Sequence, residues 1–218
     1  MQNSFLEFRR YNDPALASEL IDLLKSNNIA YTAEESALSF DPTFVNSQSL
    51  TDYTIKIAAA DFVKVNQLLV EHEEATLSPI ESDHYLLKFS NSELIDILIK
   101  ADEWSATDHA LAIRLLRQRG AMPDDDKLND LKQDYLNSLR KPAKPQTTWI
   151  TVGYIFAALG GIMGLFIGWH LMKHKNTLPN GEQAHGYIEG DRKHGRRIFI
   201  IGIIGVLLAL CIRIYQST

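Results

Sequence analysis

The chain has 218 residues, enough for one soluble domain of ordinary size and an appendage. Residues 1–139 carry 24 acids and 12 bases, whereas residues 140–218 carry 3 acids and 10 bases. An acidic head is repelled by phosphates, which argues against nucleic acid as a partner. The single cysteine, Cys211, excludes an intrachain disulfide and a multi-cysteine metal site.

The first 89 residues predict alternating strands and helices. The opening segment lacks the apolar core of a signal peptide, so we expect a folded domain to begin with a strand. Asp13 can cap a helix whose first turn holds Pro14. The segments "IAYTA" and "DYTIKIAA" predict two strands, Asp61 can cap a second helix, and "HYLLKF" at 84–89 predicts a fourth strand. This order predicts an α+β fold for residues 1–89, a ferredoxin-like domain with a split βαβ sheet.

The segments "FLEFRRYNDPALASELIDLLKSNNIAYTAEE" and "YTIKIAAADFVKVNQLLVEH" resemble a small bacterial family of prokaryotic signal-transducing proteins. The resemblance covers residues 4–74 and implies a compact ferredoxin-like domain. That family is a domain of unknown function, so the resemblance implies no catalytic residue. The later segment "FSNSELIDILIKADEWSATDHALAIRLLRQRG", with the two apolar runs after it, is similar to uncharacterised two-span membrane proteins of Bacteroidota.

Residues 90–140 predict a helical satellite. Ser90 and Glu93 have the spacing of a capping box, and Gly120 can end a helix. The apolar spacing indicates three short helices, at 91–101, 106–119 and 124–140. The segment at 141–148 contains two prolines, which favour a stiff linker.

Two apolar runs follow the linker. Residues 149–172 contain no Asp, Glu, Lys or Arg, and as a helix they would extend about 36 Å, enough to cross a hydrocarbon core of about 30 Å. Trp149 and Trp169 lie near the ends of this run, where indole rings favour the membrane boundary. The second run, at 198–215, can span if its flanking arginines extend to the interface. We therefore expect a C-terminal transmembrane helical hairpin, against the alternatives of a buried soluble helix for the first run and an interfacial segment for the second.

Small residues recur on one face of each run. In a membrane, glycine lets a second helix approach closely, so this pattern predicts helix packing within the chain or between copies in a homo-oligomer. The residues concerned are Gly160, Gly164, Gly168, Gly205 and Ala209.

The loop at 173–197 is basic. Four of its bases form a cluster that could contact an anion or a lipid headgroup, with a simple helix anchor as the alternative. They are Arg192, Lys193, Arg196 and Arg197. The positive-inside rule alone would place this loop in the cytoplasm, but the head would then have to cross the membrane without a signal. We therefore expect the head and the C-terminus in the cytoplasm and the loop outside, in a multi-pass inner-membrane protein.

No catalytic constellation stands out in the sequence. Four histidines, at positions 170, 174, 185 and 194, could be drawn as a metal site, but no carboxylate accompanies them, so we expect neither a metal nor a cofactor. Nucleotide-binding and nucleophile-elbow motifs are absent from the sequence.

These features predict a membrane-anchored binding or signal-transducing module without evident catalytic activity. Its expected partners are the lipid bilayer and a protein that docks on a sheet edge or on the helical satellite. An enzyme would instead show a deep pocket with convergent, pKa-shifted groups in the head. The other alternative is a structural subunit of an envelope complex that acts through its transmembrane helices.

Overall fold

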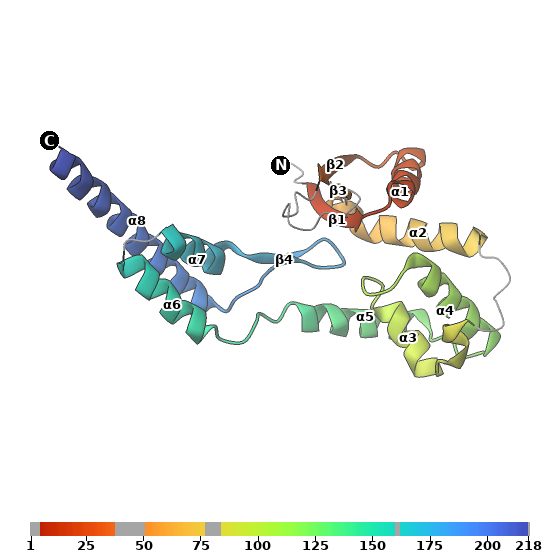
Figure 1. Cartoon of the computed structure of the whole chain (residues 1–218). Helices are drawn as coiled ribbons and strands as arrows, with labels where there is room; N and C mark the ends of the chain where they lie inside the picture. Colours follow the sequence, from red (N-terminus) through yellow and green to blue (C-terminus); the bar gives the residue numbers. More distant parts are fainter. Residues whose placement is uncertain (1–4, 38–50, 77–83, 160–161, 218) are drawn as a thin grey trace. The chain divides into compact units, whose positions relative to one another are not determined.

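The computed structural model describes residues 5–37, 51–76, 84–159 and 162–217. The chain forms two compact units. The first contains residues 1–137 and the loop Thr177–Glu182, and the second contains residues 138–176 and 183–218. The fold is α+β, with a small antiparallel sheet followed by a series of helices (Figure 1).

The first unit begins with a three-stranded sheet. Strands β1 (Phe5–Tyr11) and β2 (Tyr31–Ala37) both pair antiparallel with β3 (Thr51–Ala58), in the order β1-β3-β2. The first and second strands therefore run parallel to each other on either side of the third. Each predicted strand is observed, apart from the fourth.

Two helices pack on one face of this sheet. Helix α1 (Pro14–Ser26) begins where Asp13 accepts a hydrogen bond from the Ala15 amide at 2.8 Å, which confirms the predicted cap. A 3-10 turn, η1 (Ala59–Asp61), leads into α2 (Phe62–Thr76), and Asp61 is the last residue of that turn. The buried side chains that form the core are Ala17, Leu20, Leu24, Ile29, Ile55, Ile57, Phe62 and Val65.

The predicted strand at 84–89 is wrong, because this segment forms a 3-10 helix, η2 (Tyr85–Lys88). Leu86 is fully buried among the helices rather than paired with the sheet. The Arg119 guanidinium donates to the carbonyl of Leu87 at 3.1 Å and to that of Phe89 at 2.6 Å. These two carbonyls are therefore satisfied by a side chain, and the segment packs as part of the helical core.

The three predicted satellite helices are observed as α3 (Asn91–Ile99), α4 (Ala106–Gln118) and α5 (Asp125–Leu139). The capping box at the start of α3 is complete, since Ser90 Oγ accepts from the Glu93 amide and Glu93 accepts from the Ser90 amide at 2.7 Å. Helix α2 belongs to both cores of the unit. Its Phe62 and Val65 lie in the sheet core, while Val70 packs against the helical core.

The second unit contains three apolar helices, α6 (Thr147–Ala158), α7 (Ile162–Lys173) and α8 (Glu189–Ser217). It also contains strand β5 (Gln183–His185) and the first two residues of its partner β4 (Lys175–Thr177). The predicted single helix over 149–172 is wrong, because this run forms α6 and α7, which fold back on each other. A Cβ atom at Gly164 of α7 would lie 2.6 Å from the Ala157 Cα of α6, so the two backbones are in direct contact. The second predicted run is a helix, and α8 extends well beyond it on its N-terminal side.

Candidate functional site

A cleft of about 430 Å³ opens in the first unit where α2, α4 and α5 meet. This volume lies in the range of small-molecule sites, which is about 300–1,000 Å³. Helix spacing places the lining residues on three converging stripes. They include Val63, Asn66, Val70, Glu71 and Glu74 of α2, Asp102 after α3, His109 and Ile113 of α4, and Lys132, Tyr135 and Leu136 of α5.

His109 is the most deeply buried polar residue of this cleft, with 8% of its surface exposed. Burial, together with the nearby Lys132 charge, lowers the pKa of His109 to about 4, so the imidazole is neutral near neutral pH. The ring hydrogen-bonds to the Leu98 backbone, but its Nδ1 is buried and has no partner among the described residues. Unpartnered buried acceptors are uncommon in folded proteins, because they lose hydration without compensation.

Lys132 lies on the neighbouring helix and is half-buried. Burial lowers the pKa of the Lys132 ammonium group, and the charge of Asp125 opposes this shift only in part. In the portion of the chain that the structure describes, no carboxylate lies within 4 Å of this ammonium group. The cleft therefore holds a cation that is partly desolvated and unpaired.

Tyr135 lies one helical turn beyond Lys132. Its hydroxyl donates to Asp102 Oδ2 at 3.2 Å and to Glu103 Oε1 at 3.1 Å. Burial, followed by the Asp102 charge, raises the pKa of the Tyr135 hydroxyl. The phenol consequently stays protonated and ties α5 to the turn after α3, which fixes this wall of the cleft.

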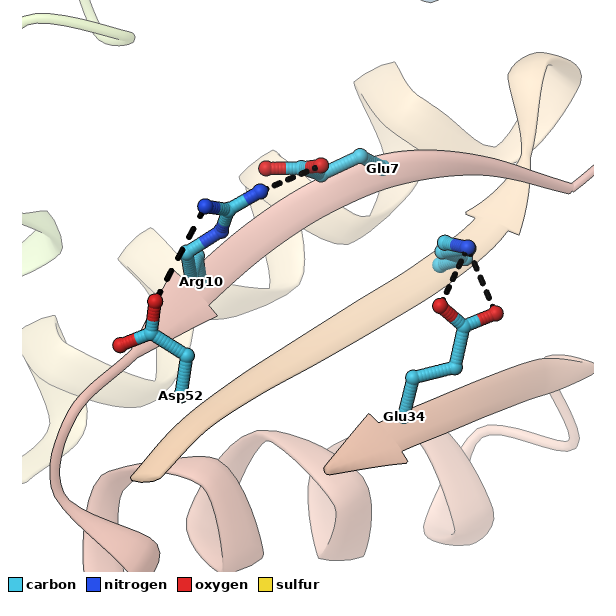
Figure 2. A network of polar contacts seen from close by, with 5 residues as sticks. Glu7, Arg10, Glu34 and Asp52 are labelled. Atoms are coloured by element: carbon cyan, nitrogen blue, oxygen red, sulfur yellow. Dashed lines mark hydrogen bonds and ion pairs between the residues drawn. The ribbon is translucent and has the colours of Figure 1, made fainter. Parts of the chain in front are cut away.

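The outer face of the sheet offers a different kind of surface. Lys56 donates to both carboxylate oxygens of Glu34, each at 2.6 Å. Arg10 lies between Glu7 and Asp52 (Figure 2), and its guanidinium is 3.1 Å from the Glu7 carboxylate and 3.9 Å from that of Asp52. Such partly exposed pairs contribute little to stability, about 0–1 kcal/mol each. Because these charges already satisfy one another, the face is less suited to capturing a charged ligand than the cleft is.

The predicted packing residues fall into three groups. Gly164 contacts α6, and Gly168 contacts α8, where its Cβ would lie 2.6 Å from the Phe199 amide nitrogen. Gly160 and the side chain of Ala209 lie outside the described residues, and Gly205 is half-buried on α8. The close contacts on α8 include Gly195 and Gly202, which our sequence analysis did not single out.

The four predicted basic residues gather on the first nine residues of α8. Lys193, Arg196 and Arg197 are exposed, and Lys193 pairs with Glu189 at 2.8 Å. Arg192 is half-buried, and its Nε has no partner among the residues described.

The cleft was missed in the sequence because its residues come from segments that are far apart. Two signals could have indicated it. His109 precedes Ile113 by one turn on the apolar face of α4, and Lys132 follows Leu128 by one turn on that of α5. Each is an ordinary residue for a helix, and only the packing of α4 against α2 and α5 makes them a site.

We compared the chain with protein families, curated proteins and solved structures. No family model matches the chain, and neither the curated proteins nor the solved structures contain a significant match. The candidate site therefore rests on its own geometry, and the resemblance at residues 4–74 stays a prediction.

Proposed function

We propose that this chain is a membrane-anchored binding module whose head takes a small polar ligand in the cleft between α2, α4 and α5. The head is the acidic first unit, which we interpret as a ferredoxin-like domain shortened by one strand and extended by three helices. The second unit supplies the anchor, and the head faces the cytoplasm of a cell whose inner membrane holds α8.

One observation carries the proposal: the buried, unpartnered Nδ1 of His109 lies in the same cleft as the unpaired ammonium group of Lys132. Both groups have lost hydration without gaining a protein partner. A bound molecule that hydrogen-bonds to both would recover that cost, which runs to about 1–3 kcal/mol for a buried group.

The chemistry of the two groups defines the ligand. His109 donates to the Leu98 backbone through one nitrogen, so its Nδ1 is an acceptor and requires a donor such as a hydroxyl. Lys132 requires an acceptor, best an anionic oxygen. The cleft therefore suits a small anion that also carries a hydroxyl group.

A thermal-shift experiment on the full chain in detergent tests this. The probe is glycerol 3-phosphate, which has both groups, compared with glycerol and with inorganic phosphate, which have one each. At ten times its Kd a ligand stabilises the folded state by about 1.4 kcal/mol, which for a unit of this size raises Tm by about 5 °C. We expect glycerol 3-phosphate to raise Tm more than the other two probes together.

Two variants make the result specific. Lys132→Met should remove the contribution of the phosphate, and Lys64→Met, at an exposed position of α2, should leave it unchanged. Equal shifts in both variants would mean that the probe binds elsewhere, and the proposed site would be wrong.

The anchor is proposed on the basis of α8. Among the described residues, Glu189–Gln216 is the one helix that is long and apolar enough to cross a membrane. Its apolar side chains are largely exposed in the second unit, with Leu207, Leu208 and Ile214 at 56%, 58% and 67%. Extraction of the chain by alkaline carbonate without detergent would contradict this anchor.

Docking of a protein partner remains part of the proposal. Among the described residues, the strand order leaves β1 and β2 at the sheet edges, and a register shift between Glu7 and Arg9 interrupts the first of them. The β2 edge is the better candidate for pairing with a partner strand.

An enzyme is the second candidate, because the cleft has the convergent, pKa-shifted groups that we expected of one. Three groups have shifted pKa values, but His109 is too weak a base near neutral pH and Tyr135 too weak an acid. Lys132 is the strongest catalytic candidate, since its lowered pKa increases the fraction of free amine. Treatment with pyruvate and borohydride should leave Lys132 unmodified if the module only binds, whereas a reduced adduct on this residue would favour an enzyme.

A further inference from the structure

We propose that α6 and α7 form a re-entrant hairpin, which enters and leaves the membrane on the side of the head, and that the bases at its base bind anionic lipid headgroups. This places α8 as the single crossing helix. The proposal concerns the second unit alone and does not depend on the ligand cleft.

The first argument is the antiparallel packing of α6 and α7. Ala157 near the end of α6 meets Gly164 near the start of α7, and Gly153, one turn earlier in α6, meets Ile167 further along α7. Each helix has 12 residues and is about 18 Å long, which is little more than half of a hydrocarbon core of about 30 Å. The pair can therefore enter one leaflet and return, but neither helix can cross.

The second argument is a set of hydrogen bonds that joins the start of α6 to the end of α7 and the start of α8. The Gln146 amide donates to the buried Asp191 carboxylate at 2.8 Å, and the Ala143 amide donates to the Gly186 carbonyl at 2.9 Å. The Gly186 amide in turn donates to the His174 carbonyl at 3.2 Å. The linker, the loop after α7 and the first turn of α8 consequently lie at the same end of this unit.

The third argument is the position of the aromatic residues. Trp149 and Trp169 line one apolar pocket together with Tyr187, although a single helix over 149–172 would hold the two indoles at opposite ends. Gly168, next to the second indole, packs on Phe199, and from there to Tyr215 α8 rises about 24 Å. These aromatic side chains thus mark two levels, separated by slightly less than the hydrocarbon thickness.

Helix α8 also continues beyond the adjoining ends of α6 and α7, as Figure 1 shows. Leu165 of α7 packs against Gly202, the fourteenth residue of the 29 in α8, and the part beyond is exposed along most of its length. A long helix supported over its first half by a shorter hairpin is the arrangement expected when only the long helix crosses.

The charges then form a basic collar, which we define as the nine bases of residues 140–144, 173–175 and 192–197. All nine belong to the end where the linker, the loop and the start of α8 meet, while Arg213 lies near the other end of α8. Most are exposed, and the half-buried Arg192 has an Nε without an acceptor in the described chain. A lipid phosphate oxygen supplies such an acceptor.

This arrangement also removes a conflict in the sequence. With two crossings, the six bases of the loop faced away from the head, against the positive-inside rule. With one crossing, the head, the linker and the loop share the cytoplasmic side, and the bases on that side outnumber those on the other by nine to one.

Cysteine accessibility in the full chain tests the crossing. In a Cys211→Ser background, single cysteines are placed at Ser26, Gln183 and Gln216, which are exposed in the head, the loop and the end of α8. They are labelled with a membrane-impermeant maleimide in sealed vesicles of known orientation. We expect the first two to react from one side and the third from the other.

Two outcomes would overturn the proposal. If Gln183→Cys reacts from the side opposite to Ser26→Cys, residues 149–172 cross the membrane as one span. If all three cysteines react from the same side, α8 does not cross.

A lipid-retention measurement tests the collar. The full chain is reconstituted in vesicles of phosphatidylcholine and phosphatidylglycerol, extracted gently, and analysed for bound lipid by native mass spectrometry. We expect phosphatidylglycerol to be enriched among the lipids bound to the parent chain. In the triple variant Lys193→Gln, Arg196→Gln, Arg197→Gln this enrichment should be at least about fivefold lower, which is the effect of losing one contact between a base and a headgroup.

The matched control also removes three positive charges, but from the head, by the substitutions Lys25→Gln, Lys64→Gln and Lys127→Gln. Enrichment should survive in this variant. Equal loss in both variants would assign the effect to net charge, and no enrichment in the parent chain would mean that the collar does not bind anionic headgroups.

Discussion

The burial of His109 predicts a specific pH dependence of stability. In the folded head the pKa of His109 is about 4, compared with 6.5 in an exposed imidazole. Between these two pKa values His109 is protonated in the unfolded chain but neutral in the folded head. The free energy of unfolding therefore falls as the pH falls below about 6.5. The stability is fully present above that value and is lost progressively down to pH 4.

The magnitude follows from the two pKa values. Between about pH 7 and pH 5 the difference in proton binding removes about 2 kcal/mol of stability, and His109 is too well buried for solvent to screen this effect strongly. The variant His109→Gln keeps an N–H donor for the Leu98 backbone but does not titrate. Between pH 7 and pH 5 the free energy of unfolding should therefore fall by about 2 kcal/mol less in this variant than in the parent chain.

Urea unfolding of the full chain in detergent measures this difference. Trp104 packs edge-on against Phe89 in the helical core and reports on the head once Trp149 and Trp169 are replaced by Phe. The control is Gln118→Ala, since Gln118 is exposed at the end of α4 and has no titratable group, so this variant should keep the pH dependence of the parent. Parallel pH profiles for the parent and His109→Gln would refute the reasoning.

Three further predictions concern single positions. Lys132→Met should raise the pKa of His109 above about 4, because the lysine charge is one of its causes, and an NMR titration of the imidazole would contradict this if the pKa stayed unchanged. Ser90→Ala should lower the free energy of unfolding by about 1 kcal/mol through loss of the α3 cap, as measured by urea unfolding. Gly164→Val should destabilise the second unit by about 1–3 kcal/mol, since its Cβ would overlap the α6 backbone. Gly190→Ala should not destabilise it, because the nearest atom to the added Cβ lies at 3.9 Å. Thermal unfolding followed by tryptophan fluorescence compares the two variants.

The local elements of the head were predictable because their signals are short-range. Asp13 followed by Pro14 predicts the start of α1, and the pair Ser90 and Glu93 predicts that of α3; both caps are observed. Each depends on hydrogen bonds within four residues of the chain, so a sequence pattern contains all the information required.

The strand predicted at 84–89 was wrong because the conformation of this segment depends on contacts that are distant in the chain. Its apolar residues suit a strand as well as a helical turn, and the choice was made by Arg119, thirty residues away, which binds the carbonyls of Leu87 and Phe89. Composition decides that such a segment is buried, while its partners decide its backbone conformation.

The sequence by itself determined that an acidic, mixed α+β head precedes a basic, strongly apolar C-terminal region, because charge and hydropathy are additive properties of the residues. Only the tertiary structure decided that residues 149–172 fold back at Ala157 and Gly164 and that His109 and Lys132 share a cleft. Both results depend on contacts between segments that are distant in the chain or that reverse direction, and such contacts are selected by packing and backbone approach rather than by local periodicity.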